Sequence, residues 1–203
     1  MISVQVNNLT KKYNQHTIFS ELNFEHEKGV LGISGENGSG KSTLMKCLVY
    51  LLRPNAGSIS WKNGPKLMGQ KQVKAKVGYL APYINLYSEL SVLENLRFLI
   101  EAGGIKADED QLSGLLGKME IIHLKDQLFG KLSTGQQQRA KLAAALVRDP
   151  QILLLDEPGS NLDKKGHELV TRIVREASEA EKLVFIASND PAEIALCDEV
   201  VEL

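Results

Sequence analysis

One stretch, residues 35–43, constrains the fold of this chain more than any other. It reads Gly-Glu-Asn-Gly-Ser-Gly-Lys-Ser-Thr, with a glycine wherever the backbone would have to turn tightly. A short apolar run at 29–34 precedes it, and residues 43–49 continue it at helical spacing. A strand, a glycine-rich turn and a helix in this order predict an α/β fold with a parallel sheet.

The same stretch, which we call the phosphate loop, predicts a site for a nucleoside triphosphate. Its N–H groups and the positive end of a helix beginning near Lys41 would form an anion site. Lys41 would reach the β- and γ-phosphates, and the Ser42 hydroxyl would bind Mg²⁺. A surface loop with a chance match is the alternative, which the flanking strand and helix disfavour. The expected nucleotide contacts are Gly35, Asn37, Gly38, Ser39, Gly40, Lys41, Ser42 and Thr43.

Composition excludes several classes of function. Lys and Arg number 24 against 25 Asp and Glu, so no excess of positive charge indicates a nucleic-acid partner. None of the cysteines and histidines has metal-ligand spacing, and we expect them to be core or solvated side chains: Cys47, Cys197, His16, His26, His123 and His167. Cysteines without such a pattern favour a reducing, cytoplasmic setting. No apolar stretch approaches the roughly 18 residues of a membrane-spanning helix, and the first residues do not resemble a signal peptide. Any membrane role would therefore run through a partner.

The pattern along the chain predicts one domain over residues 1–203 with a helical insertion. Expected strands are 2–6, 18–24, 30–33, 57–61, 77–80, 151–155 and 183–187, with turns at 13–15 and 62–65. Ser91 and Glu94 form a capping-box signature, and the stretch from about 84 to 146 contains no convincing strand. An amphipathic helix is expected near 164–180. Residues 1–83 and 147–203 would form the α/β core with a β-subdomain, and about 84–146 a helical subdomain.

Two carboxylates follow the most apolar strand. Residues 152–155 read Ile-Leu-Leu-Leu, and Asp156 and Glu157 come directly after them. At the end of a buried parallel strand, Asp156 would bind Mg²⁺ directly or through water. Glu157 would orient and deprotonate an attacking water. The alternative is a core strand that ends in solvated acids, which is common where no phosphate loop precedes it.

A third stretch, 132–139, reads Leu-Ser-Thr-Gly-Gln-Gln-Gln-Arg. Ser133 and Gly135 stand where a helix would begin, so their hydroxyl and N–H groups form a second candidate anion site. An ordinary helix N-cap is the competing interpretation, and the stretch alone favours it.

Together these motifs resemble those of the ATP-binding subunit of ATP-binding-cassette (ABC) transporters over essentially the whole chain. Residues 35–43 match the Walker A motif and 152–157 the Walker B motif. Residues 132–136 resemble the LSGGQ signature with Thr134 in place of a glycine, and 160–163 resemble the D-loop. Tyr13 stands where the family stacks an aromatic ring on adenine. The resemblance implies a P-loop NTPase (RecA-like) core with an N-terminal antiparallel β-subdomain and an inserted helical subdomain.

The resemblance also implies cofactors, partners and a location. ATP and Mg²⁺ would be sandwiched in a head-to-tail dimer, with a second copy of the chain as the expected partner subunit. The groups that reach the partner's ATP would be Ser133, Gly135, Gln136 and Asp163. An integral-membrane permease would be driven from the cytoplasmic face of the membrane, and the short single cassette slightly favours export.

Two positions depart from the family pattern. The Q-loop glutamine should follow the strand at 77–80, but the chain reads Ala81-Pro82-Tyr83 there. The switch histidine is replaced by Asn189, which can donate a hydrogen bond but carries no charge. We therefore expect a slow ATPase. A soluble ABC-type ATPase, or a nucleotide sensor with weak or no hydrolysis, is the alternative function, and a P-loop kinase is a remote one.

Overall fold

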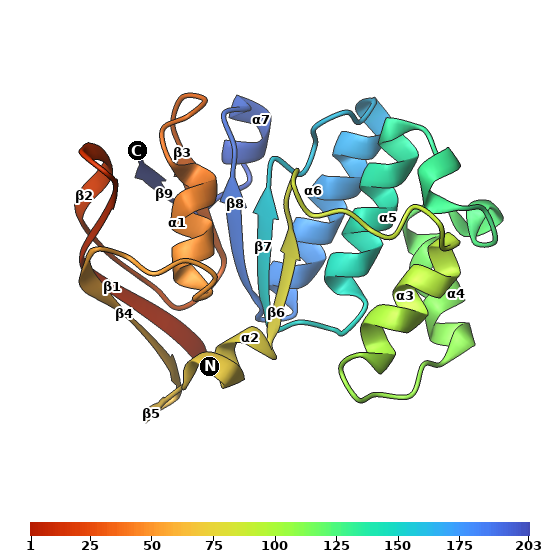
Figure 1. Cartoon of the computed structure of the whole chain (residues 1–203), viewed down its shortest axis with the longest axis horizontal. Helices are drawn as coiled ribbons and strands as arrows, with labels where there is room; N and C mark the ends of the chain where they lie inside the picture. Colours follow the sequence, from red (N-terminus) through yellow and green to blue (C-terminus); the bar gives the residue numbers. More distant parts are fainter.

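The computed structural model describes residues 1–203 as two sheets with helices around them (Figure 1). The antiparallel sheet has the order β2-β1-β4-β5, formed by β1 (Ile2–Tyr13), β2 (His16–His26), β4 (Ala56–Asn63) and β5 (Lys66–Leu67). The parallel sheet has the order β6-β7-β8-β3-β9, formed by β3 (Val30–Ser34), β6 (Val77–Leu80), β7 (Ile152–Asp156), β8 (Leu183–Ala187) and β9 (Glu199–Glu202). This arrangement confirms the expected fold class.

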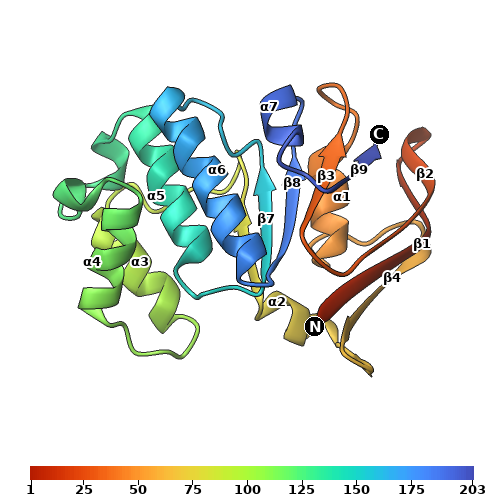
Figure 2. The ribbon, with the colours of Figure 1, turned by 180° about the vertical axis from the view of Figure 1, so that it is seen from behind.

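The parallel sheet is buried on both faces, which explains why β7 and β8 are apolar without interruption. Helix α1 (Lys41–Leu48) and helix α6 (Lys164–Glu179) cover opposite faces, as the two views show (Figures 1 and 2). Successive residues of a strand point to opposite faces. Leu154 and Phe185 accordingly pack in the cluster of α1, and Leu153 and Leu155 in that of α6.

The core around α1 also joins the two sheets. Trp61 on β4 is fully buried, and its indole Nε1 donates to the carbonyl oxygen of Leu48 at 2.8 Å. Its ring lies edge-on to Phe185 of β8, with 6.0 Å between ring centroids. The helix that follows the phosphate loop is therefore held between the antiparallel sheet and the parallel one.

Residues 84–146 are mainly helical and lie at the end of the molecule opposite the antiparallel sheet (Figure 1). They form α3 (Val92–Glu101), α4 (Glu109–Lys118), α5 (Thr134–Leu146) and two 3₁₀ turns, Ile122–Leu124 and Phe129–Lys131. The capping box is confirmed, since Ser91 Oγ accepts from the Glu94 N–H at 3.1 Å and Glu94 Oε2 from the Ser91 N–H at 2.7 Å. The division of the chain into lobes at these residues stays a prediction.

Several elements differ from the sequence expectations. Strand β1 continues to Tyr13 because register shifts absorb the break in alternation near Asn7 and Asn8. Lys62 and Asn63 belong to β4, so the expected turn at 62–65 shrinks to residues 64–65. Four elements were not expected at all: β5, α2 (Gln70–Lys74), α7 (Pro191–Ile194) and β9. Each has five residues or fewer, too short for a periodic pattern to emerge.

The parallel strands deliver the motifs to one edge of the sheet. The phosphate loop follows β3, Asp156 ends β7, Asn189 follows β8 and Tyr83 follows β6. Because parallel strands end at the same edge, residues from four distant parts of the sequence meet there. None of the helices has the length and apolar character needed to span a bilayer.

Candidate functional site

The phosphate loop has the backbone conformation that its glycines predict. Gly35, Gly38 and Gly40 all have positive φ angles, of 150°, 88° and 111°. Gly40 is the N-cap of α1, and a Cβ there would lie 2.4 Å from Ile18 Cγ2 on β2. Only glycine therefore fits between the start of α1 and the β2 strand. The helix begins at Lys41, as expected.

Lys41 lies inside the loop and also faces the end of β7. Its ammonium Nζ donates to the carbonyl oxygens of Gly35 at 2.8 Å and Glu36 at 3.1 Å. Nζ is 3.8 Å from Glu157 Oε1, and only 6% of the side chain is exposed. A cation held this way inside a loop of backbone N–H groups is suited to a polyphosphate.

Asp156 is a buried carboxylate whose two oxygens both lack a hydrogen-bond partner. Burial raises the pKa of this carboxyl group above its usual value. The Ser42 hydroxyl, the ammonium groups of Lys46 and Lys41 and the Tyr79 hydroxyl act in the opposite direction. A buried carboxylate without partners is costly unless something else satisfies it. Carboxylate and hydroxyl oxygens are ligands that Mg²⁺ accepts, so Asp156 and Ser42 fit the expected metal ion.

Glu157 occupies a strained turn beside Asp156. Its backbone has a φ of 51°, and its N–H donates to the carbonyl oxygen of Ala187 at 2.8 Å, which ties the turn to β8. Burial raises the pKa of its carboxyl group. Lys41 lowers that pKa, while Glu193 and the acids at 156 and 190 raise it. A carboxylate whose pKa is shifted toward neutral pH is suited to accept a proton from water.

The remaining nucleotide-side residues lie at the rim. Asn189 Nδ2 donates to Asn37 Oδ1 at 3.1 Å, which brings the switch position into contact with the phosphate loop. Ser39 Oγ is buried and has no hydrogen-bond partner, so it is free to donate to a phosphate oxygen. Tyr13 ends β1 half-exposed, with Lys11 Nζ 4.8 Å from its ring centroid. Its stacking on adenine stays a prediction.

The signature residues form a helix cap next to the D-loop. Ser133 caps α5, where its Oγ accepts from the Gln136 N–H at 3.4 Å and Gln136 Oε1 accepts from the Ser133 N–H at 2.9 Å. A Cβ at Gly135 would be 3.2 Å from the Asn161 carbonyl oxygen. Asp163 caps α6 by accepting from the Gly166 N–H at 2.9 Å. Ser133 and Asp163, two candidate contacts to a partner's ATP, therefore also cap helices within this chain.

Comparison with known proteins identifies the family. Residues 19–160 match the family described as "ABC transporter". The zinc import ATP-binding protein ZnuC of Buchnera aphidicola is 32% identical over 191 residues, which cover 93% of this chain and 75% of the relative. The chain belongs to the ABC transporter family. It is an ATP-binding subunit of this family, whose ATP-binding domains are ATPases.

Solved structures agree with this assignment. A dimeric ATP-binding cassette, MJ0796, in a post-hydrolysis state bound to ADP and Pi, superimposes with a TM-score of 0.86 at 25% identity. The match covers 98% of this chain and 94% of that one. The cbiO1 protein of Clostridium perfringens, part of the ABC transporter complex cbiONQ, gives a TM-score of 0.79 at 28% identity over 98% and 83% of the two chains.

Two residues of this ABC subunit were missed by sequence reasoning. Gln138 on α5 is buried, and its Nε2 donates to the Pro158 carbonyl oxygen at 3.0 Å. Glu193 on α7 is buried too, and its Oε1 accepts from the Gly159 N–H at 2.7 Å. Together they hold the turn after Glu157 from two sides. A glutamine in a polar run and a glutamate in a short helix carry no signal that distinguishes them from solvated residues.

One histidine lies in a cluster of possible metal ligands. Ligand atoms of His167, Asp190 and Glu193 lie within 4.8 Å of one another, although no histidine has metal-ligand spacing in the sequence. The cluster forms because α6 and α7 meet at the turn that contains Gly159. Glu193 already binds the Gly159 N–H and Asp190 the Ala192 N–H, so these acids anchor backbone.

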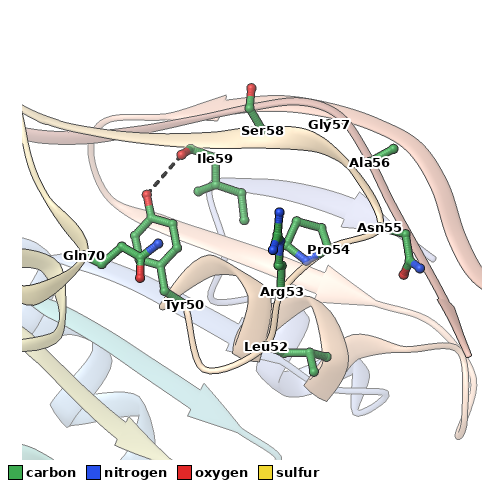
Figure 3. Close-up of a pocket in the computed structure, with 10 residues that line it drawn as sticks. All are labelled: Tyr50, Leu52, Arg53, Pro54, Asn55, Ala56, Gly57, Ser58, Ile59 and Gln70. Carbon is green, nitrogen blue, oxygen red and sulfur yellow. Dashed lines mark hydrogen bonds between the residues drawn. The ribbon is translucent and has the colours of Figure 1, made fainter.

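A separate hollow of about 510 Å³ lies away from the nucleotide site, between the end of α1 and β4 (Figure 3). Two of its polar side chains have partners within the fold. The Tyr50 hydroxyl donates to the Ile59 carbonyl oxygen at 3.0 Å, and Asn55 Oδ1 accepts from the Lys12 N–H at 2.8 Å. No residue of the phosphate loop lines it. This hollow is therefore separate from the phosphate loop.

The buried Asp156 carboxylate, which has no hydrogen-bond partner, leads to a prediction about the free energy of unfolding. Because burial raises its pKa above the ordinary 3.8, the folded chain binds this proton more tightly than the unfolded chain. The free energy of unfolding should therefore fall as the pH rises from 3.8 through the raised pKa. Asp156→Asn removes this loss. We call the pH range from 3.8 through the raised pKa the titration window. At pH values above this window and in EDTA, we expect the variant to be about 1–3 kcal/mol more stable than the wild type.

Urea unfolding at pH values below and above the window measures the effect. Below the window the two proteins should have equal stability, since the wild-type carboxyl group is then protonated in both states. The exposed Asp126 supplies the control, because Asp126→Asn should leave stability unchanged at either pH. A wild type more stable than Asp156→Asn above the window would contradict the prediction.

Proposed function

We propose that this chain is the motor subunit of an ABC transporter, and that Mg²⁺-ATP closes a dimer of two copies that drives a separate membrane permease. One observation carries the nucleotide chemistry: Lys41, Asp156 and Glu157 converge at the end of β7. Lys41 Nζ lies 3.8 Å from Glu157 Oε1, and both Asp156 oxygens await a partner. When bound, Mg²⁺ would neutralise charge on the β- and γ-phosphates.

Each residue then has a defined task. The phosphate loop binds the phosphates through backbone N–H groups, and Lys41 turns from its carbonyl partners toward the γ-phosphate. Ser42 and Asp156 would hold Mg²⁺. Glu157 orients the attacking water and accepts its proton, and Asn189 donates to the γ-phosphate from beside Asn37. Ser133 and Gly135 of the partner subunit's copy of the signature would complete the site across the dimer.

Two features support a slow rate for the isolated chain. Asn189 is neutral, so it cannot supply the charge-assisted contact of a histidine. No glutamine follows β6, and Tyr83 stands in that place. The pocket of a nucleotide sensor would have the same departures. The presence of Glu157 beside Lys41 favours an ATPase over such a sensor.

A groove between β6 and the helices supports the permease partner. It has a volume of about 250 Å³ and is lined mainly by apolar side chains, among them Leu80, Ile84, Leu86, Leu99 and Val147. Nearby, the exposed rings of Tyr87 and Phe98 stack edge-on, with 5.2 Å between centroids. Apolar surface of this kind favours a protein partner. A permease bound here would keep the chain at the cytoplasmic face of the membrane.

The direction of transport stays a prediction. The sequence slightly favours export, whereas ZnuC is a zinc import protein by name. Substrate choice would depend on the permease, so the nucleotide site contains no information about it.

Purification from native membranes tests the permease. The tagged wild type is expected to co-elute in detergent with a multi-span membrane protein. Phe98→Glu, at an exposed position of α3, should lose that protein and still bind ATP. Leu67→Glu changes a still more exposed apolar residue on β5, in the antiparallel sheet, and should retain it. Equal recovery by both variants would refute the docking surface, and absence of any membrane protein from the wild type would refute the transporter role.

A further inference from the structure

Backbone hydrogen bonds close the turn that follows Glu157. The Glu157 N–H donates to the Ala187 carbonyl oxygen of β8 at 2.8 Å, and the Glu157 carbonyl oxygen accepts from the Ser160 N–H at 3.2 Å. Two other groups of this turn have no backbone partner, the carbonyl oxygen of Pro158 and the N–H of Gly159. Buried backbone groups of this kind need a side chain to satisfy them.

Two buried side chains supply those partners. Gln138 of α5 donates through Nε2 to the Pro158 carbonyl oxygen at 3.0 Å, and the same nitrogen lies 3.5 Å from the Glu157 carbonyl oxygen. Glu193 of α7 accepts through Oε1 from the Gly159 N–H at 2.7 Å. The conformation of the turn therefore depends on a carboxamide from the helical residues as well as on the parallel sheet.

Glu157 needs such support because its backbone is strained. Its φ of 51° lies in the left-handed region, which residues with a Cβ rarely adopt. A strained residue keeps its conformation only where its surroundings over-determine it. Glu157 Oε1 lies 3.8 Å from Lys41 Nζ, so the same turn sets where this carboxylate meets the nucleotide. Loss of the Gln138 anchor would let the turn relax and displace the carboxylate.

The helix that supplies this anchor also carries the signature. Helix α5 begins at Thr134, directly after its N-cap Ser133, and Gln138 lies about one turn further on. The residues expected to reach a partner's ATP and the side chain that holds the Glu157 turn therefore belong to the first two turns of one helix. A shift of α5 would move both.

We propose that Gln138 is a positioning residue for ATP hydrolysis, through which the first turns of α5 hold Glu157 in line with the nucleotide. Its amide is buried against the backbone of the turn, so it acts on the attacking water only through Glu157. This inference rests on the role of Glu157 in the proposed function and is independent of the permease.

Single-turnover hydrolysis tests the anchor apart from nucleotide binding. Gln138→Met keeps the length of the side chain and removes its donor, whereas Gln138→Asn keeps the amide and shortens its reach by one methylene. Both variants should hydrolyse ATP about 10- to 100-fold more slowly, the cost of a misplaced reacting group. Their ATPγS affinity should stay at the wild-type level, because no phosphate contact is removed.

A double variant shows whether Gln138 acts through Glu157. Gln138→Met combined with Glu157→Gln should be no slower than Glu157→Gln alone, because residues that act as a unit have non-additive effects. Tyr50→Phe is the matched control. It also removes a donor to a backbone carbonyl oxygen at 3.0 Å, that of Ile59, and should hydrolyse ATP at the wild-type rate.

The outcomes separate this inference from the proposed function. Wild-type rates in both Gln138 variants, or loss of ATPγS binding in both, overturn the positioning role. A double variant whose loss is the product of the single losses also overturns it. In those cases a slow Glu157→Gln protein still supports the proposed role of Glu157. A Glu157→Gln protein with the wild-type rate, or a wild type without turnover, overturns that role and the inference together.

Discussion

Replacement of Glu157 by glutamine is expected to reduce ATP hydrolysis by about 10²–10⁴-fold while ATP affinity stays at the wild-type level. The amide keeps the size of the side chain and its place beside Lys41, but it cannot accept the proton of the attacking water. Because the nucleotide then persists, a dimer should accumulate in the presence of Mg²⁺-ATP. Steady-state phosphate release and light scattering measure the two effects.

The exposed Glu179 near the end of α6 provides the control, since Glu179→Gln makes the same chemical change where no ion pair is formed. It should hydrolyse ATP at the wild-type rate. A Glu157→Gln protein that stays monomeric at saturating Mg²⁺-ATP would contradict the sandwich dimer. If the wild type itself binds ATP and shows no turnover, the chain is a sensor or needs its permease.

Lys41→Ala is expected to weaken ATP binding by on the order of 10²–10³-fold, the cost of removing one partner from a buried charge pair. In the absence of nucleotide, Lys41 donates to two carbonyl oxygens of its own loop, so its removal also frees that loop. It should further raise the pKa of Glu157, because Lys41 is the cation that lowers it. Calorimetric titration with ATP measures the affinity.

An exposed lysine gives the comparison for this change. Lys71 lies on α2, in no ion pair, and Lys71→Ala should bind ATP like the wild type. Equal ATP affinity in Lys41→Ala and Lys71→Ala would remove Lys41 from the site. Loss of affinity in both would indicate a general electrostatic effect, which measurement at raised salt would distinguish.

Local patterns in the sequence were sufficient to predict the phosphate loop, strands β7 and β8, and the helix caps at Ser91 and Ser133. In each case neighbouring residues determine the structure: glycines permit a turn, an apolar run is buried, and a hydroxyl caps a helix. The resemblance to a family added the expected subdomains and the expected roles of the motifs.

Other features depend on residues that meet only after folding. Tyr79 looks like a core residue of a short strand, and nothing near it in the sequence indicates that its hydroxyl accepts a hydrogen bond from Tyr83. Glu193 becomes a buried anchor only because α7 packs at the turn that contains Gly159. Strand β9 is short and half acidic, and its pairing with β3 is a long-range event that local propensity does not encode.

The burial of Trp61 has a practical consequence. The chain has one tryptophan, and its indole donates a hydrogen bond to the last turn of the helix that begins with Lys41. Its intrinsic fluorescence therefore comes from a single, dry environment, at the end of the helix opposite the phosphate loop. Any shift of that helix when the phosphates arrive changes the surroundings of the fluorophore, so the unlabelled protein contains its own optical reporter of ligand binding.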